Sequence, residues 1–309
     1  MKKAYKNILE FVITAALTVC LVLYFGQLLD PVEAGIAMDT IKAFHMLKDD
    51  SADVIVFGSS HAWKGCDTGV MRDKYGLSAY NYACNWQTVD TTRLFVEDAL
   101  RTQSPKVVCI ETWRVGNLKY DKAMDGQIYY TRQLKDSPVK RQYLKHCFGS
   151  DAERYASYFF PLIMFHDNWT EISEENFKKP DPEHFLKSAG YMYNEGSEPA
   201  ERPDISQFEQ KKLTVDQLSE LEGIVKACER ENVSIIFYLS PVAAEYGYSD
   251  EMEKFAGENG CVYLDLNALC DEVGIDWEHD LQDLGHLNHD GAAKVADYLG
   301  RYIVENYDI

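Results

Sequence analysis

The sequence predicts an α/β protein of three layers, with helices on both faces of a parallel sheet of about five strands and one further apolar helix at the N-terminus. The candidate strands are short, almost wholly apolar runs, and segments with apolar residues at helical spacing lie between them. Continuous apolar strands that alternate with helices are typical of parallel sheets buried on both faces. A long stretch without charge predicts the N-terminal helix.

The N-terminal stretch, residues 11–29, contains no charged side chain and consists mainly of Val, Ile, Leu, Ala and Phe. As a helix it would extend about 28 Å, close to the thickness of the hydrocarbon core of a bilayer. Basic residues precede it (Lys2, Lys3 and Lys6) and acidic residues follow it (Asp30 and Glu33). By the positive-inside rule we expect a single-pass anchor in the cell membrane, with a cytoplasmic N-terminus and an extracytoplasmic catalytic domain. A cleaved signal peptide and a buried core helix are the alternatives.

The expected strands and helices follow the anchor in alternating order. The strands are residues 54–57, 79–82, 106–111, 234–239 and 261–265. Helices are expected around residues 94–100, over 218–231 and over 291–304, because apolar residues recur there at helical spacing. Ligands of such sheets bind at the carboxyl ends of the strands, so we look for the functional site there.

Residues 114–212 do not follow this alternation and are predicted to be a long insertion between the third and fourth strands. The insertion is rich first in aromatic residues and then in Pro, Glu and Asp, which indicates helices at first and a loop over residues 178–202. Insertions at this edge commonly shape access to a ligand. We therefore expect a cytoplasmic stub and anchor (1–30), a juxtamembrane segment (31–50) and one α/β domain (51–309) that contains the insertion.

Composition excludes some functions. The net charge of -19 argues against nucleic acid or an anionic membrane surface as the main partner, because both require basic patches. Of the eight cysteines, all but Cys20 lie beyond the anchor. In an oxidising space Cys66–Cys84 and Cys261–Cys270 are candidate disulfides, whereas an anaerobic host would leave thiols. No Cys-x-x-Cys motif occurs, and no cofactor is expected.

Two short motifs indicate the chemistry of the chain. Gly-Ser-Ser-His at residues 58–61 follows the first strand, and Asp-Leu-Gly-His-Leu-Asn at residues 283–288 precedes the last helix. A serine on a tight turn at the end of a strand is well placed for a nucleophile. Such a serine needs a base to take its proton, and the base needs an orienting carboxylate. Asp-x-x-His supplies both, so the two motifs together predict a site for serine-based acyl transfer.

Each motif also has a plainer interpretation. Gly-Ser-Ser alone is a common turn, and Asp-x-x-His could be the start of a helix capped by Asn288 or Asp290. Asp283, His286 and His289 could also ligate a metal at their three-residue spacing. A metal site leaves the Gly-Ser-Ser-His motif unexplained, so we expect a catalytic triad and no metal.

The chain resembles the SGNH (GDSL-like) hydrolases in both motifs, over roughly residues 50–115 and 230–305. Residues 54–61 are similar to the first block of that superfamily, and Asp-x-x-His resembles its last block. The resemblance implies a flavodoxin-like sheet, with Ser60 as nucleophile, His286 as general base and Asp283 as its orienting partner. The anchor, the Gly-Ser-Ser-His form and the Asp-x-x-His-Leu-Asn ending are more similar to the DltD-like proteins of teichoic acid D-alanylation and the alginate-type O-acetylation proteins.

Two departures from the family pattern concern the oxyanion hole. The second block of the family usually offers a glycine N–H, and here Trp86 stands in that place. The third block usually supplies an asparagine side chain, which is absent from the aligned position after the third strand. Asn85, Arg114 and Asn117 are the candidate replacements. Losing one oxyanion donor costs on the order of a hundred- to a thousand-fold in rate.

The resemblance implies a membrane-anchored serine acyl-transfer enzyme, either an O-acyltransferase or an esterase, that acts on cell-envelope polysaccharide or teichoic acid. By the same analogy, its partners are an acylated sugar or glycopolymer and a multipass membrane acyltransferase. His61, His166 and Trp169 are candidate pocket residues, because His61 follows the nucleophile and Trp faces suit sugar rings. An exposed loop histidine and a core Trp are the plainer interpretations. The alternative function is a non-catalytic envelope protein that uses the fold for binding or assembly.

Overall fold

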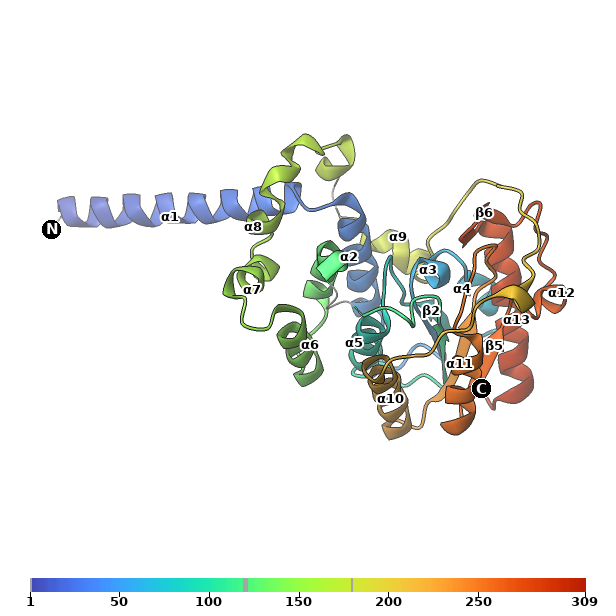
Figure 1. Cartoon of the computed structure of the whole chain (residues 1–309). Helices are drawn as coiled ribbons and strands as arrows, with labels where there is room; N and C mark the ends of the chain where they lie inside the picture. The colour runs from blue at the N-terminus through green and yellow to red at the C-terminus, as the bar shows by residue number, and fades with distance from the viewer. Residues whose placement is uncertain (1, 119–121, 179) are drawn as a thin grey trace.

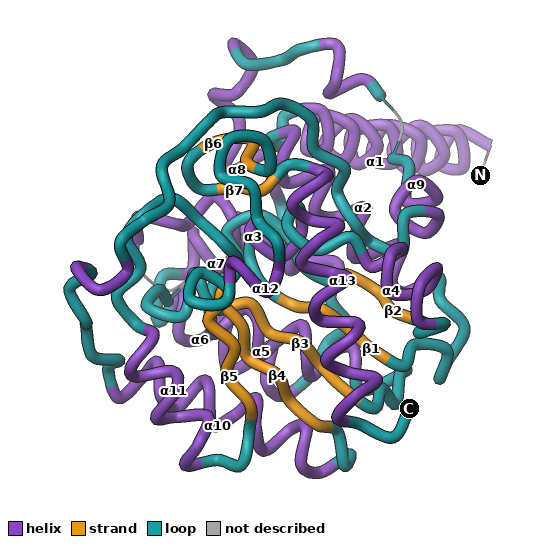
Figure 2. Tube along the Cα trace, turned by 90° about the vertical axis from the view of Figure 1, so that its right-hand side faces the viewer, coloured by secondary structure: helices purple, strands orange, loops and turns teal. Residues whose placement is uncertain are grey.

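The computed structural model describes residues 2–118, 122–178 and 180–309. A sheet of five parallel strands lies at its centre: β1 (Val54–Phe57), β2 (Ala79–Asn81), β3 (Val107–Glu111), β4 (Ser234–Leu239) and β5 (Val262–Asp265). The strand order is β2-β1-β3-β4-β5 (Figure 2). This is the flavodoxin-like order, whose ligand crevice lies between β1 and β3 at their carboxyl ends. The five predicted strands are confirmed.

Helices cover both faces of the sheet, which confirms the three-layer α/β architecture. One face is covered by α2 (Val32–His45), α5 (Val89–Ala99), α10 (Val215–Arg230) and α11 (Ser249–Glu258). The other is covered by α4 (Thr68–Tyr75), α12 (Cys270–Val273) and α13 (His289–Asn306). The predicted helices correspond to α5, α10 and α13.

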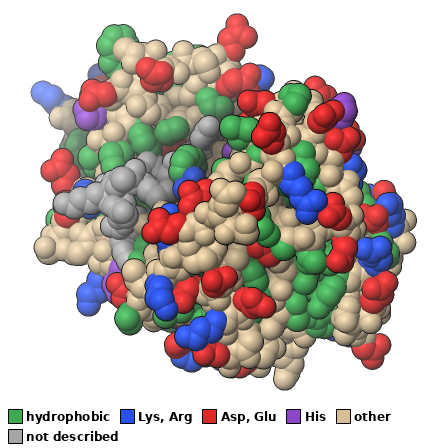
Figure 3. Space-filling model, turned by 45° about the vertical axis from the view of Figure 1, so that its right-hand side comes forward, with side chains coloured by type: hydrophobic (Ala, Val, Ile, Leu, Met, Phe, Trp, Pro, Cys, Tyr) green, Lys and Arg blue, Asp and Glu red, His purple; other side chains and the backbone are tan. Residues whose placement is uncertain are grey.

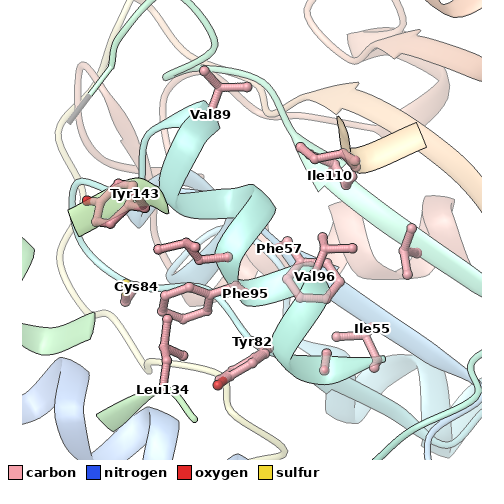
Figure 4. Close-up of a cluster of buried hydrophobic side chains, with 14 of the residues drawn as sticks. Ile55, Phe57, Tyr82, Cys84, Val89, Phe95, Val96, Ile110, Leu134 and Tyr143 are labelled. Atoms are coloured by element: carbon pink, nitrogen blue, oxygen red, sulfur yellow. The ribbon is translucent and has the colours of Figure 1, made fainter. Parts of the chain in front are cut away.

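Alternate strand residues enter two separate hydrophobic cores, one on each face. Ile55 and Phe57 of β1 lie in the core that contains Phe95 of α5 (Figure 4). Val54 and Val56 of the same strand lie in the core on the opposite face. Side chains of a strand point alternately to its two faces, so a strand covered on both sides needs an apolar residue at every position.

Helix α1 (Lys2–Leu28) stands out from the domain (Figure 1). Its segment Lys3–Leu28 is long and apolar enough to cross a membrane, with a mean hydropathy of 2.3. The helix is exposed as far as Phe25, and Gly26 is its first buried residue. The structure therefore supports one apolar helix of membrane-spanning length.

Part of the expected juxtamembrane segment forms helix α2, which packs into the core. Ile41 and Phe44 are buried, and the ring of Phe44 stacks on Tyr82 with 3.8 Å between ring centroids. At the end of the helix, His45 Nε2 lies 2.6 Å from Asp98 Oδ2. Helix α2 is thus attached to the domain by both apolar and polar contacts.

The insertion is helical at first, as predicted. Its elements are η1 (Lys122–Gln133), α6 (Pro138–Phe148), α7 (Ala152–Phe159), α8 (Pro161–Phe165), η2 (His166–Thr170), η3 (Glu174–Phe177), α9 (Pro182–Lys187) and η4 (Ile205–Gln207). The loop expected over residues 178–202 is interrupted by α9, so that prediction is wrong in part. Asp181 caps α9 by accepting a hydrogen bond from the His184 N–H, and Pro182 occupies the first turn, where a proline is tolerated.

No disulfide joins the eight cysteines, all of which lie within the described residues, and six of them are buried. Neither candidate disulfide is formed. Cys66 and Cys84 cannot meet because they belong to the cores on opposite faces of the sheet. Burial raises the pKa of the Cys109 thiol to about 12 and raises that of Cys66 well above its ordinary value, which makes these thiols poor nucleophiles.

The acidic surplus is distributed over the surface. On the face shown in Figure 3, Asp and Glu side chains alternate with Lys and Arg. Many of these charges form ion pairs between exposed side chains, such as Lys226 with Glu222 at 3.0 Å. Exposed pairs of this kind contribute little to stability and indicate a solvated surface.

Candidate active site

The turn after β1 brings Ser60 to the carboxyl edge of the sheet. Gly58 has a φ of +144°, which residues with a side chain rarely adopt, and a Cβ at this position would lie 2.6 Å from the Cβ of Glu111. Ser59 then caps the short helix α3 (Ser60–Trp63), and its hydroxyl oxygen accepts a hydrogen bond from the His61 N–H at 3.4 Å. Ser60 is the first residue of α3 and stands at the end of β1.

His286 and Asp283 come from a short hairpin formed by β6 (Leu281–Asp283) and β7 (His286–Leu287). The two residues are partners across the hairpin, so their side chains are neighbours. The Gly285 N–H donates to Asp283 Oδ1 at 2.8 Å and fixes the turn between them. Asn288 also caps α13, accepting from the Gly291 N–H at 3.2 Å. The helix cap considered as an alternative is therefore present together with the Asp–His pair.

The structure brings the three candidate catalytic side chains into one hydrogen-bonded chain. Ser60 Oγ lies 2.8 Å from His286 Nε2. His286 Nδ1 lies 2.9 Å from Asp283 Oδ1 and 3.0 Å from Asp283 Oδ2. A carboxylate at Nδ1 favours the tautomer with the proton on Nδ1, which leaves Nε2 free to accept the serine proton. This geometry is suited to general-base activation of a serine.

The Asp283 carboxyl has a pKa below its ordinary value. Burial acts to raise this pKa, but the hydrogen bonds from the Gly285 N–H and from His286 together outweigh burial. The side chain is therefore a carboxylate at neutral pH. A charged Asp283 can orient the His286 ring and stabilise the imidazolium that forms when Ser60 loses its proton.

His61 lies beside His286. Its ring is buried between Trp113 and His286, with ring centroids 4.5 Å and 4.7 Å away. Burial lowers the pKa of His61 well below its ordinary value, and the charges of His286 and Arg114 lower it further. A neutral ring stacked on His286 limits the motion of the imidazole. The structure thus places His61 as a support for His286.

Glu111, at the end of β3, is the site residue that sequence analysis missed. Its carboxylate accepts hydrogen bonds from the Ser59 hydroxyl at 3.1 Å, from the Trp113 N–H at 2.8 Å, and from the N–H groups of Ser59 and Ser240. It therefore joins the loops after β1, β3 and β4. The side chain is buried, and burial raises its pKa to about 7. An acidic residue closing a five-residue apolar strand was the signal available in the sequence.

The oxyanion-hole candidates lie in two loops that meet each other. Trp86 has a φ of +57°, a conformation that glycine adopts most readily, so this position has the backbone character of a glycine although it carries a Trp. The Arg114 guanidinium lies 4.1 Å from the centroid of the Trp86 ring. Asn85 is half-buried in the same loop, which is attached to the turn that holds Ser60 by the Cys84 N–H donating to the Gly58 carbonyl at 3.3 Å.

Burial lowers the pKa of the Arg114 guanidinium, and the charge of Glu111 acts in the opposite direction. Arg114 nonetheless remains a cation at neutral pH, because an arginine side chain is effectively always protonated. The site thus has a positive charge beside the loop that follows β2. Such a charge can stabilise a developing oxyanion.

A cavity of about 470 Å³ opens at the carboxyl ends of β4 and β5. Tyr246, Asp265 and Asn267 are among its lining residues. The ring of Tyr246 also stacks on Trp113, with centroids 5.8 Å apart, and Trp113 in turn contacts His61. A row of neighbouring rings therefore connects the wall of this cavity to His286.

The other predicted pocket residues lie elsewhere. His166 and Trp169 belong to η2, next to α8 and beside the end of α1, whereas α3 and the β6–β7 hairpin lie on the other side of α2 (Figure 1). Both side chains are exposed. The structure therefore does not bring them to the triad.

The alternative metal site is not formed. His289 Nδ1 lies 3.9 Å from Asp67 Oδ2, and its ring contacts Tyr193. Asp283 and His286 bond to each other instead of converging with His289. Within residues 2–118, 122–178 and 180–309, no group of three or more His, Cys, Asp or Glu side chains is arranged to hold a metal ion.

Comparison with known proteins adds little to this geometry. No protein-family model matches the chain, and no curated protein matches it. Among solved structures, the chain is similar to a "putative acylhydrolase" from Bacteroides fragilis, with 10% sequence identity. The match covers 85% of this chain and 93% of that chain, with a TM-score of 0.41. A similarity this low does not assign an activity, so a functional argument has to come from the site.

Proposed function

We propose that this chain is a serine acyl-transfer enzyme of the SGNH type, either an O-acyltransferase or an esterase. The observation that supports this most directly is the hydrogen-bonded chain from Ser60 through His286 to Asp283. The SGNH hydrolases have their triad residues in the same order along the chain, Ser, then Asp, then His, and within similar motifs. Neither a simple turn nor a helix cap requires Ser60 and His286 to bond to each other.

In the proposed reaction, Ser60 Oγ attacks the carbonyl carbon of an ester while His286 Nε2 takes the hydroxyl proton. Asp283 stabilises the imidazolium, and the Trp86 N–H, Asn85 and Arg114 are the candidate donors to the oxyanion. Collapse of the tetrahedral intermediate breaks the ester bond, and the leaving alcohol takes the proton from His286. Water or a sugar hydroxyl then attacks the acyl-Ser60 ester, with His286 again as base, and releases an acid or an acylated sugar.

We propose further that α1 anchors the enzyme in the cell membrane with the catalytic domain outside the cytoplasm. The support is the apolar length of α1 together with the lysines before it. The resemblance to envelope-modifying proteins favours small acyl groups, such as acetyl or D-alanyl, on cell-envelope polysaccharide or teichoic acid. By the same analogy, a multipass membrane acyltransferase is the partner on the donor side.

A non-catalytic binding or assembly role is the competing function. The observation that favours it is the missing asparagine after β3, which leaves the oxyanion hole without its usual side-chain donor. A hydrogen bond between Ser60 and His286 would still persist in such a protein. The two functions therefore differ in turnover and not in the geometry of the triad.

Hydrolysis of p-nitrophenyl acetate by the purified full chain in detergent tests the proposal. We expect Ser60→Ala and His286→Ala to lose roughly 10⁴- to 10⁶-fold in kcat. Ser59→Ala is the matched control, because the Ser59 hydroxyl bonds to Glu111 and not to His286. Adding methyl glucoside and measuring its acetylation separates transfer from hydrolysis. A folded wild type no faster than Ser60→Ala would instead support the non-catalytic role.

A further inference from the structure

A group of large apolar side chains is exposed on the insertion, and we call it the aromatic collar. It lies on α7, α8, η2, η3 and the residue that links α7 to α8, and it consists of Tyr155, Phe159, Phe160, Ile163, Trp169 and Phe177. Each of these side chains is between 42% and 68% exposed. Soluble proteins rarely expose so many large apolar residues close together unless the surface contacts a partner or a membrane.

The collar is exposed although the helices that present it are firmly held. On the inner side of α7, the Tyr158 hydroxyl lies 3.0 Å from Thr131 Oγ1 and the Ser157 hydroxyl lies 2.8 Å from the Tyr129 hydroxyl. The ring of Tyr129 also contacts Phe165 of α8, with centroids 4.9 Å apart. The insertion thus has a buried aromatic layer of its own, and the collar is its outer face.

The collar lies where α1 meets the domain. A Cβ on Gly26 would be 3.8 Å from the backbone nitrogen of Leu162 in α8. The side-chain amides of Asn168 and Asn176 donate to the carbonyl groups of Leu29 and Leu28 at 3.2 Å and 3.1 Å. In Figure 1, α8 lies beside the last turns of α1, and α7 follows on the far side of α8. The contacts fix the collar next to the end of the apolar helix.

The length of α1 sets the depth of the collar in a membrane. Its 27 residues extend about 40 Å, whereas the hydrocarbon core of a bilayer is about 30 Å thick. The helix is exposed up to Phe25, whereas Gly26 and Leu28 in its last turn are buried. A bilayer crossed by α1 would therefore end close to α8, which places the collar at the boundary between lipid and water. Aromatic side chains are enriched at this boundary.

We propose that the aromatic collar docks on the bilayer that α1 crosses, with its rings in the interfacial region of the lipid. This inference rests on the proposed membrane anchor. The exposed charges beside the collar are mainly acidic, including Asp167, Glu171 and Glu174, so binding depends on apolar contact and not on anionic lipids. A membrane helix alone leaves the tilt of the domain relative to the bilayer undetermined, whereas a helix and a collar together hold the domain in one orientation.

Quenching of Trp fluorescence by brominated phosphatidylcholine tests this proposal on the full chain in vesicles. We expect quenching in the wild type and its loss in Trp169→Phe. Trp86→Phe is the matched control, because Trp86 is also exposed but lies in the loop beside the nucleophile turn. Its removal should leave the quenching in place. Tyr24→Trp, in the exposed part of α1, reports the anchor separately.

Quenching at Tyr24→Trp without any contribution from Trp169 would refute membrane docking of the collar but would still support the anchor. The collar would then be a surface that binds a protein. Absence of quenching at both positions would overturn the anchor and the collar together. Replacing Phe159 and Phe160 by Ser should reduce the quenching of Trp169 while ester hydrolysis is retained. That second variant separates failure of the collar from failure of the proposed acyl transfer.

Discussion

Replacing Glu111 by Gln should remove a pH dependence of stability that the wild type has. The buried carboxyl has a pKa of about 7 in the folded protein, compared with an ordinary value of 4.5. The folded state therefore binds the proton more tightly than the unfolded state. The resulting stabilisation is fully present below about pH 4.5 and is lost as the pH rises through about 7. The variant has no proton to lose at this position.

The magnitude follows from the two pKa values. At about 1.4 kcal/mol for each pKa unit, the difference corresponds to about 3 kcal/mol in the free energy of unfolding between roughly pH 4 and pH 8. A second effect does not depend on pH. The amide nitrogen of Gln would face N–H donors such as that of Trp113, which costs about 1–3 kcal/mol. The change in pH slope is therefore a cleaner test than stability at one pH.

Urea unfolding of the full chain in detergent, followed by Trp fluorescence at several pH values, measures this slope. We expect the free energy of unfolding of the wild type to fall by about 3 kcal/mol more than that of Glu111→Gln from roughly pH 4 to pH 8. Glu229→Gln, an exposed carboxylate on α10, is the matched control and should follow the wild type. Identical slopes for Glu111→Gln and the wild type would refute the raised pKa.

Two further substitutions test the site and its turn. Asp283→Asn should leave folding intact but reduce kcat for ester hydrolysis by roughly 10³- to 10⁴-fold, because His286 loses its carboxylate partner; an unchanged kcat would exclude a triad. Gly58→Ala should destabilise the protein by roughly 2–5 kcal/mol, since its Cβ would contact Glu111 at an unfavourable φ. Gly76→Ala, at a φ of +72° in open space, should cost only about 1 kcal/mol. Equal shifts in the thermal midpoint of the two variants would contradict the close approach at Gly58.

Much of the fold could be predicted from the sequence because its signals are local. The five strands are short apolar runs, and each is recognisable without knowing its neighbours. The Ser60 turn and the Asp-x-x-His pair were equally visible. Each consists of a few consecutive residues whose types are required by the chemistry. The parallel sheet was predicted from the alternation of apolar strands with helices, whereas the hairpin and the distances between the two motifs are visible only in the structure.

The remaining features depend on contacts between distant segments. Glu111 received no role because its hydrogen-bond donors come from the loops after three different strands. His166 and Trp169 were expected near the site, but Asn168 and the ion pair between Arg132 and Asp30 help to hold this part of the insertion beside the end of α1. The division of the chain into anchor, juxtamembrane segment and domain stays a prediction.

Fluorophosphonate labelling of the full chain, read by intact mass, tests the proposed nucleophile most directly. We expect one adduct on the wild type and on Ser59→Ala, and none on Ser60→Ala or His286→Ala. That result would establish Ser60 as a serine activated by His286 and leave only water or sugar as the acceptor to be decided. A folded wild type that takes no label, while a known serine esterase in the same tube does, would contradict the triad.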